Sequence, residues 1–447
     1  MSNVTRTIKA SDLAEEIGSD APKEHLLIKM PGYIADSDSA ILVSAGRPDS
    51  WGRCQVTYYD IMNKMRRSVS TPSHIAIKTR KASAGVLKKV SQILMRCSRM
   101  YCTIGADPEM FVTDKNDSSK IIPAWTFLPA KGKTPKTTYS RGGGMADGEI
   151  YWDGFQAEFT SAPGQCLGYF SDTIAAGLRK LNGLAEAAGG KLSISSVLPV
   201  SQDFLREQKE EHVAFGCAPS TNAYGLTTPP LDGREVPYRF AGGHIHLGDY
   251  SFAGDKAKIL KMVEAMDMIL GVASVSLLGK LDNPIRRRYY GLPGEYRMPP
   301  HGLEYRVLSN AWLCHPLAMN LVYDLARVAC SVGLGVSNLS DVWDCKRGEM
   351  IEILVDNDIP AARKVLERNK EAFLDILQLA YSSDRYAERA ADIYLKGIES
   401  RVPDPTNLVK NWHMAQGEWV THCGNTGCSL SSVYRNENPP KAAPQAR

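Results

Sequence analysis

Two short stretches of the chain decide the predicted fold, GGHIHLG at residues 242–248 and GLEYRV at residues 302–307. Both alternate as a β-strand requires, because successive side chains of a strand point to opposite faces of a sheet. The polar side chains of each stretch therefore share one face, and they are His244 and His246 in the first and Glu304 and Arg306 in the second. Two strands that gather charged or metal-binding groups on one side predict the floor of an active site.

Two more stretches repeat the pattern, IGADPEMFV at residues 104–112 and YWDGFQAEF at residues 151–159. Their aligned polar side chains are Asp107 and Glu109 in the first and Gln156 and Glu158 in the second. Read as one strand, the second stretch puts Asp153 on its other face, among aromatic side chains. A solvated sheet face is the simpler interpretation of such alternation. Glycine in or beside each stretch instead favours the close approach of a ligand.

Helical patterns accompany these strands. Apolar residues recur at helical spacing over residues 171–188 and 256–278. Four further helices are predicted in the last third of the chain, at residues 313–332, 341–355, 361–381 and 386–399. The apolar faces of the strands can pack on such helices, as a two-layer domain requires. The sequence therefore predicts an α+β domain.

We expect the chain to have three regions: residues 1–100 as an accessory region, residues 101–400 as the catalytic domain with its C-terminal helices, and residues 401–447 as a partly disordered tail. From residue 61 to residue 100 there are ten Lys or Arg and no Asp or Glu. This basic stretch, at residues 64–99, is a candidate surface for a polyanion. It lacks the aromatic residues that stack on bases, so nucleic acid is a less favoured partner than solvent.

Composition argues against several classes of protein. The 447 residues are 43% hydrophobic and 23% charged, which is ordinary for a globular protein. We find no apolar run close to the ~18 residues of a membrane span, and the longest candidate, residues 269–278, is interrupted by Gly271. Acidic residues near the N-terminus do not suit a secretory signal, and the ten scattered cysteines fit a reducing cytoplasm. A metal cluster could be formed by His413, His422, Cys423 and Cys428.

The polar face suits hard divalent cations. Mg²⁺ prefers oxygen ligands and is commonly held by carboxylates together with phosphate oxygens, and a site that includes an imidazole also accepts Mn²⁺. Arginine makes forked contacts with phosphate oxygens, and an arginine-rich loop at residues 286–297 leads into the strand that carries Glu304. These groups predict a nucleoside triphosphate held by metals and arginines, with phosphoryl transfer promoted by positioning and charge neutralisation.

The order of the motifs is similar to that of a known family. Asp-Pro-Glu, Gln-x-Glu, Gly-Gly-His-x-His, an arginine-rich loop and Gly-x-Glu-Tyr-Arg follow one another between residues 101 and 316. This order resembles the carboxylate–amine ligases, or amidoligases, of the glutamine synthetase-like superfamily, and most of all those of tailed phages. The resemblance implies a curved, mostly antiparallel sheet backed by helices, which binds ATP and Mg²⁺ or Mn²⁺. It also implies that a carboxylate is activated to an acyl phosphate, which an amine then attacks.

The resemblance also implies roles for single residues of this chain. The metal ligands would be Asp107, Glu109, Glu158, His244 and Glu304. His246 would approach the nucleotide, and Arg306 would contact the transferring phosphate. Phosphate charge would be neutralised by one or more of Arg286, Arg287, Arg288 and Arg297.

One departure from the family concerns the first strand. The family usually has Glu-x-Glu where this chain has Asp107-Pro108-Glu109. Aspartate is shorter than glutamate, and Asp153 is therefore a substitute ligand to consider. Proline cannot donate to a strand ladder, so we expect this strand to lie at an edge or to be bulged.

The attacking amine must lose a proton, so a carboxylate near its pocket would act as a base, and Glu295 and Glu149 are the candidates. A rival interpretation is a metal-dependent hydrolase, with zinc and an activated water held by His244, His246, Asp107 and Glu109. That interpretation assigns no function to the arginines of residues 286–297 or to Arg306. A non-catalytic virion or binding protein on a ligase fold is a third possibility. The acid and the amine stay open: a free amino acid, a cell-wall peptide and a protein side chain all fit.

Overall fold

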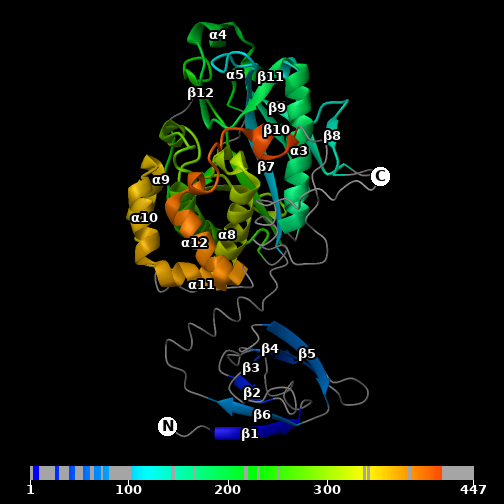
Figure 1. Cartoon of the computed structure of the whole chain (residues 1–447), viewed down its shortest axis with the longest axis vertical. Coiled ribbons are helices and arrows are strands. Elements are labelled where there is room, and N and C mark those ends of the chain that lie inside the picture. The colour runs from blue at the N-terminus through cyan, green and yellow to red at the C-terminus, as the bar shows by residue number, and fades with distance from the viewer. Residues whose placement is uncertain are drawn as a thin grey trace, which may run out of the picture. The chain divides into compact units, whose positions relative to one another are not determined.

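The structure is a computed structural model of the chain (Figure 1). It describes six strands within the first hundred residues and, beyond them, residues 102–141, 146–164, 167–215, 220–228, 232–249, 252–335, 339, 343–380 and 384–414. The chain divides into two compact units, Met1–Met100 and Tyr101–Arg447. Each unit has a sheet of its own.

The N-terminal unit contains a six-stranded antiparallel sheet in the order β1-β6-β2-β3-β4-β5. Its strands are β1 (Val4–Lys9), β2 (Leu26–Lys29), β3 (Ala40–Ala45), β4 (Cys54–Asp60), β5 (Met65–Thr71) and β6 (His74–Thr79). Strands β5 and β6 occupy the first part of the basic stretch. Its remainder, residues 80–99, lies outside the described residues, and polyanion binding stays a prediction.

The C-terminal unit is built on a nine-stranded sheet in the order β13-β16-β17-β15-β7-β10-β9-β8, with β11 paired to β7. The inner strands are β7 (Thr103–Asp114), β15 (Gly243–Gly248), β17 (Gly302–Tyr305), β10 (Gln156–Phe159) and β9 (Gly148–Asp153). The outer strands are β16 (Glu295–Arg297), β13 (Thr221–Asn222), β8 (Thr137–Tyr139) and β11 (Gly190–Ser193). The named strands of this sheet all pair in the antiparallel sense. The predicted α+β fold with a mostly antiparallel sheet is confirmed.

The stretch at residues 151–159 is a hairpin, not the single strand that the sequence predicted. Strands β9 and β10 meet at Gly154, whose φ of +61° suits glycine better than residues with a side chain. The reversal puts Gln156 opposite Asp153 and Glu158 opposite Tyr151. Residues that lie opposite each other in an antiparallel pair share a face. Asp153 is therefore on the same face as Glu158, and its predicted position on the other face was wrong.

The position of Pro108 also differs from the prediction. Strand β7 is not an edge strand, because it pairs with β15 on one side and with β10 on the other. Its register with β15 is continuous through Pro108, which lies opposite Gly243. Its pairing with β10 ends at Glu109, the residue next to the proline. Proline has no backbone N–H to donate, and at Pro108 this interrupts the pairing of β7 with β10 but not its pairing with β15.

Helices accompany the sheet (Figure 1). They are α3 (Leu167–Ala187), α4 (Gln202–Glu207), α5 (Glu210–Val213), α6 (Lys256–Ala265), α7 (Val272–Leu278), α8 (Pro316–Gly335), α9 (Arg347–Asp356), α10 (Ile359–Arg368), α11 (Lys370–Ala380), α12 (Asp384–Lys396) and α13 (Leu408–Asn411). A π-helical segment, Met266–Gly271, joins α6 to α7. Figure 1 shows α8 to α12 grouped together, with α3 running beside the strands. The short pair β12 (Val197–Pro199) and β14 (Tyr238–Phe240) completes the unit.

The helix predicted at residues 361–381 is two helices, α10 and α11. Asn369 lies between them and is buried. Its side chain donates to the carbonyl oxygen of Asp344 at 2.9 Å and accepts from the backbone N–H of Asp344 at 2.7 Å. Because this amide binds a distant segment, the chain turns at Asn369 instead of continuing one helix.

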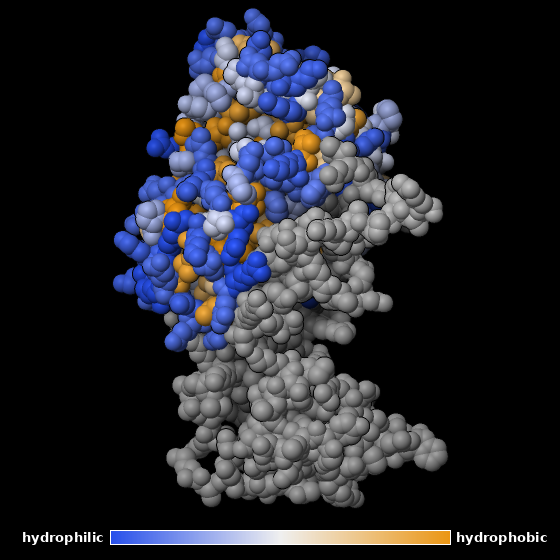
Figure 2. Space-filling model, in the orientation of Figure 1, coloured by the Kyte–Doolittle hydropathy of each residue, from blue (hydrophilic) through white to orange (hydrophobic). Residues whose placement is uncertain are grey.

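The face of the sheet opposite the polar residues is apolar and packs on helices. Leu303, Tyr305 and Val307 are fully buried there. The Tyr305 hydroxyl donates to Asp267, in the π-helical segment, at 2.7 Å. The outer surface of the C-terminal unit is mainly hydrophilic on the face drawn in Figure 2, with hydrophobic residues showing between the polar ones.

One helix among the described residues, Pro316–Leu334, is long and apolar enough to cross a membrane by length and composition. The sequence prediction had overlooked this run. In the structure 82% of the most apolar stretch of this helix is buried inside the protein. It packs against α6 and α3, which is the environment of a core helix.

The region after residue 400 is partly integrated into the unit, although the prediction made it a separate tail. Val402 and Leu408 are buried, and Trp412 is fully buried. The Trp412 ring N–H donates to the carbonyl oxygen of Leu313 at 2.7 Å. Residues 401–414 thus pack with the rest of the C-terminal unit, and residues 415–447 lie outside the described residues.

Candidate active site

Strand pairing brings the predicted polar residues to one face of the sheet. His244 lies opposite Asp107, and His246 lies opposite Glu304. On the other side of β7, Glu158 lies opposite Glu109. Since opposed residues share a face in antiparallel pairs, the four stretches of sequence meet on one surface.

Three of these residues form a first group of candidate metal ligands, Asp107, His246 and Glu304. Each can offer one ligand atom, and these atoms all lie within 4.8 Å of one another. Nε2 of His246 is 3.0 Å from Oδ1 of Asp107. Burial alone would raise the pKa of Asp107, but the charge of His246 and hydrogen bonds from His244 and His246 bring the pKa below its usual value. Asp107 is therefore held as an anion beside an imidazole.

A second group of candidate ligands consists of Glu109, Asp153 and Glu158. Their carboxylate oxygens also lie within 4.8 Å of one another. Burial and the neighbouring charge of Asp153 raise the pKa of Glu109 to about 7. Burial and the charge of Asp107 raise the pKa of Glu158 well above its usual value. Three carboxyls this close are costly as anions unless a cation lies among them.

The two groups fit hard divalent cations. Five of the six candidate ligands are carboxylates, and the sixth is an imidazole, a donor set that suits Mg²⁺ or Mn²⁺. Neither group contains two histidines. The zinc set of the hydrolase interpretation is therefore not one of these two groups, although both of its histidines lie beside Asp107. His413 is described, but His422, Cys423 and Cys428 lie outside the described residues, so that alternative cluster stays a prediction.

His244 is in this region, but it is not a member of either ligand group. It is buried, and its Nδ1 lies 3.4 Å from Oδ1 of Asp107. Burial and the charge of Arg306 lower the pKa of His244 to about 4, so its ring is neutral near pH 7. A neutral ring that donates from Nδ1 to Asp107 has Nε2 free to accept, and Nε2 lies 2.5 Å from the hydroxyl of Tyr290.

Tyr290 links Glu109 of the second group to His244 and Arg306, which in turn contact the first group, and the sequence interpretation missed it. Besides His244, its hydroxyl lies 3.2 Å from Oε1 of Glu109. It also accepts a hydrogen bond from Nη2 of Arg306 at 3.2 Å. A methyl group added at Gly242 would come within 2.6 Å of His244 and 3.1 Å of the Tyr290 hydroxyl, so glycine permits this approach. The only signal in the sequence was the position of Tyr290 in the arginine-rich loop.

Arg306 and Arg297 lie beside the first group. Arg306 is almost fully buried and donates from Nη1 to Glu304. Arg297 lies opposite Glu304 in the register of β16 and β17, and its Nη1 is 3.7 Å from a Glu304 oxygen. Both arginines were predicted to act on phosphate, and both lie where a phosphate bound at the first group would be in reach.

Arg286, Arg287 and Arg288 are placed differently. Nη2 of Arg286 donates to the carbonyl oxygen of Val307 at 2.9 Å, and Nη1 donates to that of Tyr290 at 3.1 Å. Arg287 is also buried and donates to the carbonyl oxygens of Gly291 and Val307. Arg288 is exposed. Arg286 and Arg287 thus fasten the loop that carries Tyr290 to the end of β17.

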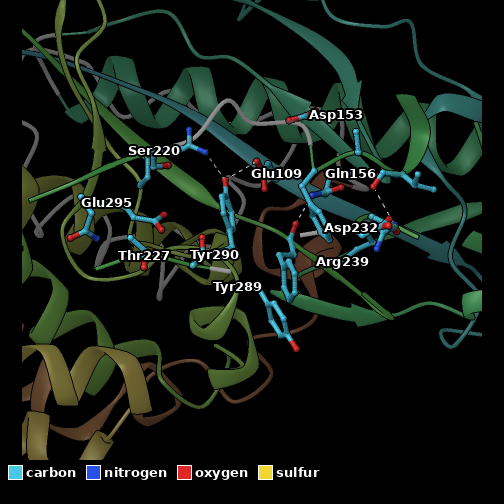
Figure 3. A pocket seen from close by; sticks show the side chains of 18 of the residues that line it. Glu109, Asp153, Gln156, Ser220, Thr227, Asp232, Arg239, Tyr289, Tyr290 and Glu295 are labelled. Carbon is cyan, nitrogen blue, oxygen red and sulfur yellow. Dashed lines mark hydrogen bonds between the residues drawn. The ribbon is translucent and has the colours of Figure 1, made fainter. Parts of the chain in front are cut away.

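A large cavity opens beside the second group of ligands. Its volume is ≈ 1110 Å³. Its inner wall includes Glu109, Asp153, Gln156, Tyr290, Glu295 and Arg306. Figure 3 shows Glu109, Asp153 and Gln156 on one side of Tyr289 and Tyr290, with Glu295, Ser220 and Thr227 on another. The rings of Phe215, Phe240 and Tyr289 stack along the wall, with centroids 5.8 Å and 5.3 Å apart.

The two base candidates differ in position. Glu295 is buried and lines the cavity. It accepts the backbone N–H of Gly291 at 3.1 Å, and burial raises its pKa. Glu149 is half-exposed, pairs with Lys136 and is not part of the cavity wall. The geometry therefore favours Glu295 of the two.

The polar face and its loop coincide with a family signature. Residues 233–353 match the model of the family described as phage phiEco32-like COOH.NH2 ligase-type 2. Over this segment the match agrees with the predicted resemblance to the amidoligases. The matched segment contains His244, His246, Tyr290, Glu295, Glu304 and Arg306. The carboxylates of β7, β9 and β10 precede it in the chain and join it through strand pairing.

Two solved structures are similar over most of the chain. "GmaS/ADP complex-Conformation 1" has 11% sequence identity and a TM-score of 0.35, with 82% of this chain and 84% of that chain covered. "Apo GmaS without ligand" has the same identity and TM-score, with 82% and 83% covered. At this level of similarity neither structure informs the assignment of residues in this chain. A comparison with curated proteins finds no match.

Proposed function

We propose that this amidoligase joins a carboxylate to an amine at the expense of ATP, through an acyl-phosphate intermediate. One observation carries the proposal. Two groups of three candidate metal ligands lie on one sheet face, and within each group the ligand atoms lie within 4.8 Å of one another. Arg306 donates a hydrogen bond to Glu304, a member of the first group. Such an arrangement suits a polyphosphate that bridges cations and arginines.

Each of the two groups would bind a cation with a different role. Asp107, His246 and Glu304 would hold a cation beside the nucleotide phosphates, where Arg297 and Arg306 can add positive charge. Glu109, Asp153 and Glu158 would hold a cation on the side of the cavity. Bound there, Mg²⁺ or Mn²⁺ would neutralise phosphate charge and polarise the reacting oxygens.

In the first step an oxygen of the substrate carboxylate attacks the γ-phosphorus of ATP, and the bond from that phosphorus to the β-phosphate oxygen breaks to release ADP. Arg306 is placed to meet the charge that develops on the transferring group. In the second step the amine nitrogen attacks the acyl carbon and phosphate leaves. The proton of the amine passes to a carboxylate, for which Glu295 on the cavity wall is our choice.

The size of the cavity bears on the substrates. A volume of ≈ 1110 Å³ exceeds the usual ~300–1,000 Å³ of a small-ligand pocket. A free amino acid would fill only a small part of it. We therefore favour a peptide-sized substrate over a free amino acid. The phage description of the family suggests that the reaction takes place during infection, in the host cytoplasm, where ATP is plentiful.

Thermal stability in the presence of nucleotide tests the proposal. ATP with Mg²⁺ should raise the melting temperature well above the value with ATP or Mg²⁺ alone, through binding linkage. The same mixture should release ADP slowly, and Glu304→Gln should abolish both effects. Glu349→Gln, which alters an ion pair with Arg368 outside the two ligand groups, serves as the control. Equal melting temperatures with and without Mg²⁺, or tightly bound zinc by metal analysis, would refute the ligase proposal.

A further inference from the structure

A small, partly enclosed cavity lies beside the loop that carries Tyr290. Its volume is ≈ 20 Å³. Four of the polar side chains that line it matter here: Ser274 on α7, Asp282 in the following loop, Arg287 in the arginine-rich loop, and Asn357 after α9. Each side chain has one buried polar atom without a hydrogen-bond partner among the described residues. The atoms are Oγ of Ser274, Oδ1 of Asp282, Nε of Arg287 and Oδ1 of Asn357.

Four unpaired polar atoms around one cavity are unusual, because buried polar groups in native proteins are nearly always paired. Leaving each of them unsatisfied would cost free energy. The remaining polar atoms of these side chains are already engaged. Nδ2 of Asn357 donates to the carbonyl oxygens of Gly279 and Asp282 at 2.7 Å and 3.1 Å. Oδ2 of Asp282 accepts from Nη2 of Arg287 at 3.3 Å.

We propose that this cavity binds one water molecule as a permanent part of the structure. The volume exceeds the ~10–15 Å³ that a single water requires. The chemistry also matches a water, which offers two donors and two acceptors. Asp282 and Asn357 each present an oxygen that accepts, Arg287 presents an N–H that donates, and the Ser274 hydroxyl can donate as well.

A monovalent cation suits the cavity less well than water. The Arg287 guanidinium lines it with a positive charge that does not titrate. Of the groups that face the cavity, only Asp282 carries a negative charge, and Arg287 already pairs with that carboxylate. A neutral molecule that both donates and accepts therefore fits better than an ion.

Arg287 and Asn357 already bond to Asp282, and the water would join Ser274 of α7 to these three residues. Arg287 is the link to the active site, because its Nη1 donates to the carbonyl oxygens of Gly291 and Val307. Gly291 follows Tyr290, and Val307 follows Arg306. A water on Nε of Arg287 would thus complete the support of both residues from behind. The inference does not depend on the proposed ligase reaction.

A crystal structure of the full chain at about 1.5 Å resolution tests the inference directly. We expect one density peak at hydrogen-bonding distance from at least three of the four atoms. A cavity without a peak, with Nε of Arg287 bonded directly to Oδ1 of Asp282, would overturn the inference. A peak with the short contacts of a metal ion would also overturn it.

Two substitutions of Ser274 give a second test by thermal unfolding. Ser274→Ala removes one partner but leaves room for the water. Ser274→Val fills the space and expels the water, so that Asp282, Arg287 and Asn357 lose their partner. We expect Ser274→Val to melt about 2–5 °C below Ser274→Ala, since unsatisfied buried groups destabilise. If the cavity is dry, filling it should stabilise, and a Ser274→Val protein that melts at or above Ser274→Ala would contradict the inference.

Discussion

Tyr290→Phe removes one oxygen from the centre of the candidate active site and leaves the ring in place. The lost hydroxyl is the group that joins His244, Glu109 and Arg306, at 2.5 Å, 3.2 Å and 3.2 Å. A hydrogen bond to a charged partner such as Arg306 contributes about 1.5–3 kcal/mol. If the bond matters most when charge develops on the transferring phosphate, kcat should fall about 10- to 100-fold, since each ~1.4 kcal/mol is tenfold in rate.

The assay for this variant is Mg²⁺-dependent release of ADP, with the melting temperature measured in parallel. Tyr394→Phe is a matched control, because the Tyr394 hydroxyl is also buried and donates to the carbonyl oxygen of Leu321 at 2.8 Å, in helix α12 away from the sheet face. We expect similar losses of stability in the two variants and a loss of turnover only in Tyr290→Phe. Unchanged turnover in a folded Tyr290→Phe protein would show that the hydroxyl positions nothing the reaction uses.

Four further predictions follow from the same site. Arg306→Lys should lower turnover by about 10²-fold or more while the protein stays folded, because lysine keeps the charge but loses the planar fork; retention of full activity would remove Arg306 from the phosphate site. Tyr305→Ala, on the opposite face, should instead lower the free energy of unfolding by roughly 3 kcal/mol, as aromatic core truncations do, measured by denaturant titration. Burial raises the pKa of Glu109 and of Asp267 to about 7, so the folded protein retains protons on these carboxyls that the unfolded chain releases near pH 4. The free energy of unfolding without metal should therefore fall as the pH rises from about 4 to about 7. A rise over that range would contradict the burial of these carboxyls. Removal of metal with EDTA should lower the melting temperature most above pH 7, because Glu109 has lost its proton there and no proton competes with the cation for its carboxylate. An effect of EDTA that does not depend on pH would place the metal elsewhere.

Much of the candidate active site could be predicted from sequence, because alternation along a strand determines which side chains share a face. The alternation of His244 with His246, and of Asp107 with Glu109, defines a common face before any partner strand is known. The positions of these residues in the sheet follow from that rule. The same rule failed at residues 151–159, because a glycine that reverses the chain cannot be distinguished by alternation from a glycine within a strand. Asp153 was therefore assigned to the wrong face.

The arginines show a different limit of sequence reasoning. Arg286, Arg287 and Arg288 are chemically equivalent in the sequence, and each suits phosphate. Only the packing of the loop determines that two of them bind backbone carbonyl oxygens and the third is exposed. Tyr290 was missed for a similar reason, since a tyrosine in a loop has no periodic pattern. Its partners come from three other segments, which only the tertiary fold brings together.

The packing of residues 401–414 determines where the protein can be shortened for expression. A version that ends at residue 400 keeps every helix from α3 to α12, yet it loses Trp412, which is fully buried. Replacing a buried tryptophan by alanine alone costs about 3–5 kcal/mol, a large share of the stability of most domains. The carbonyl oxygens of Leu313 and Cys314, which accept from Trp412 and Asn411, would also lose their donors. A gene fragment for crystallisation should therefore extend at least to residue 414, and one cut at 400 is expected to yield aggregated protein.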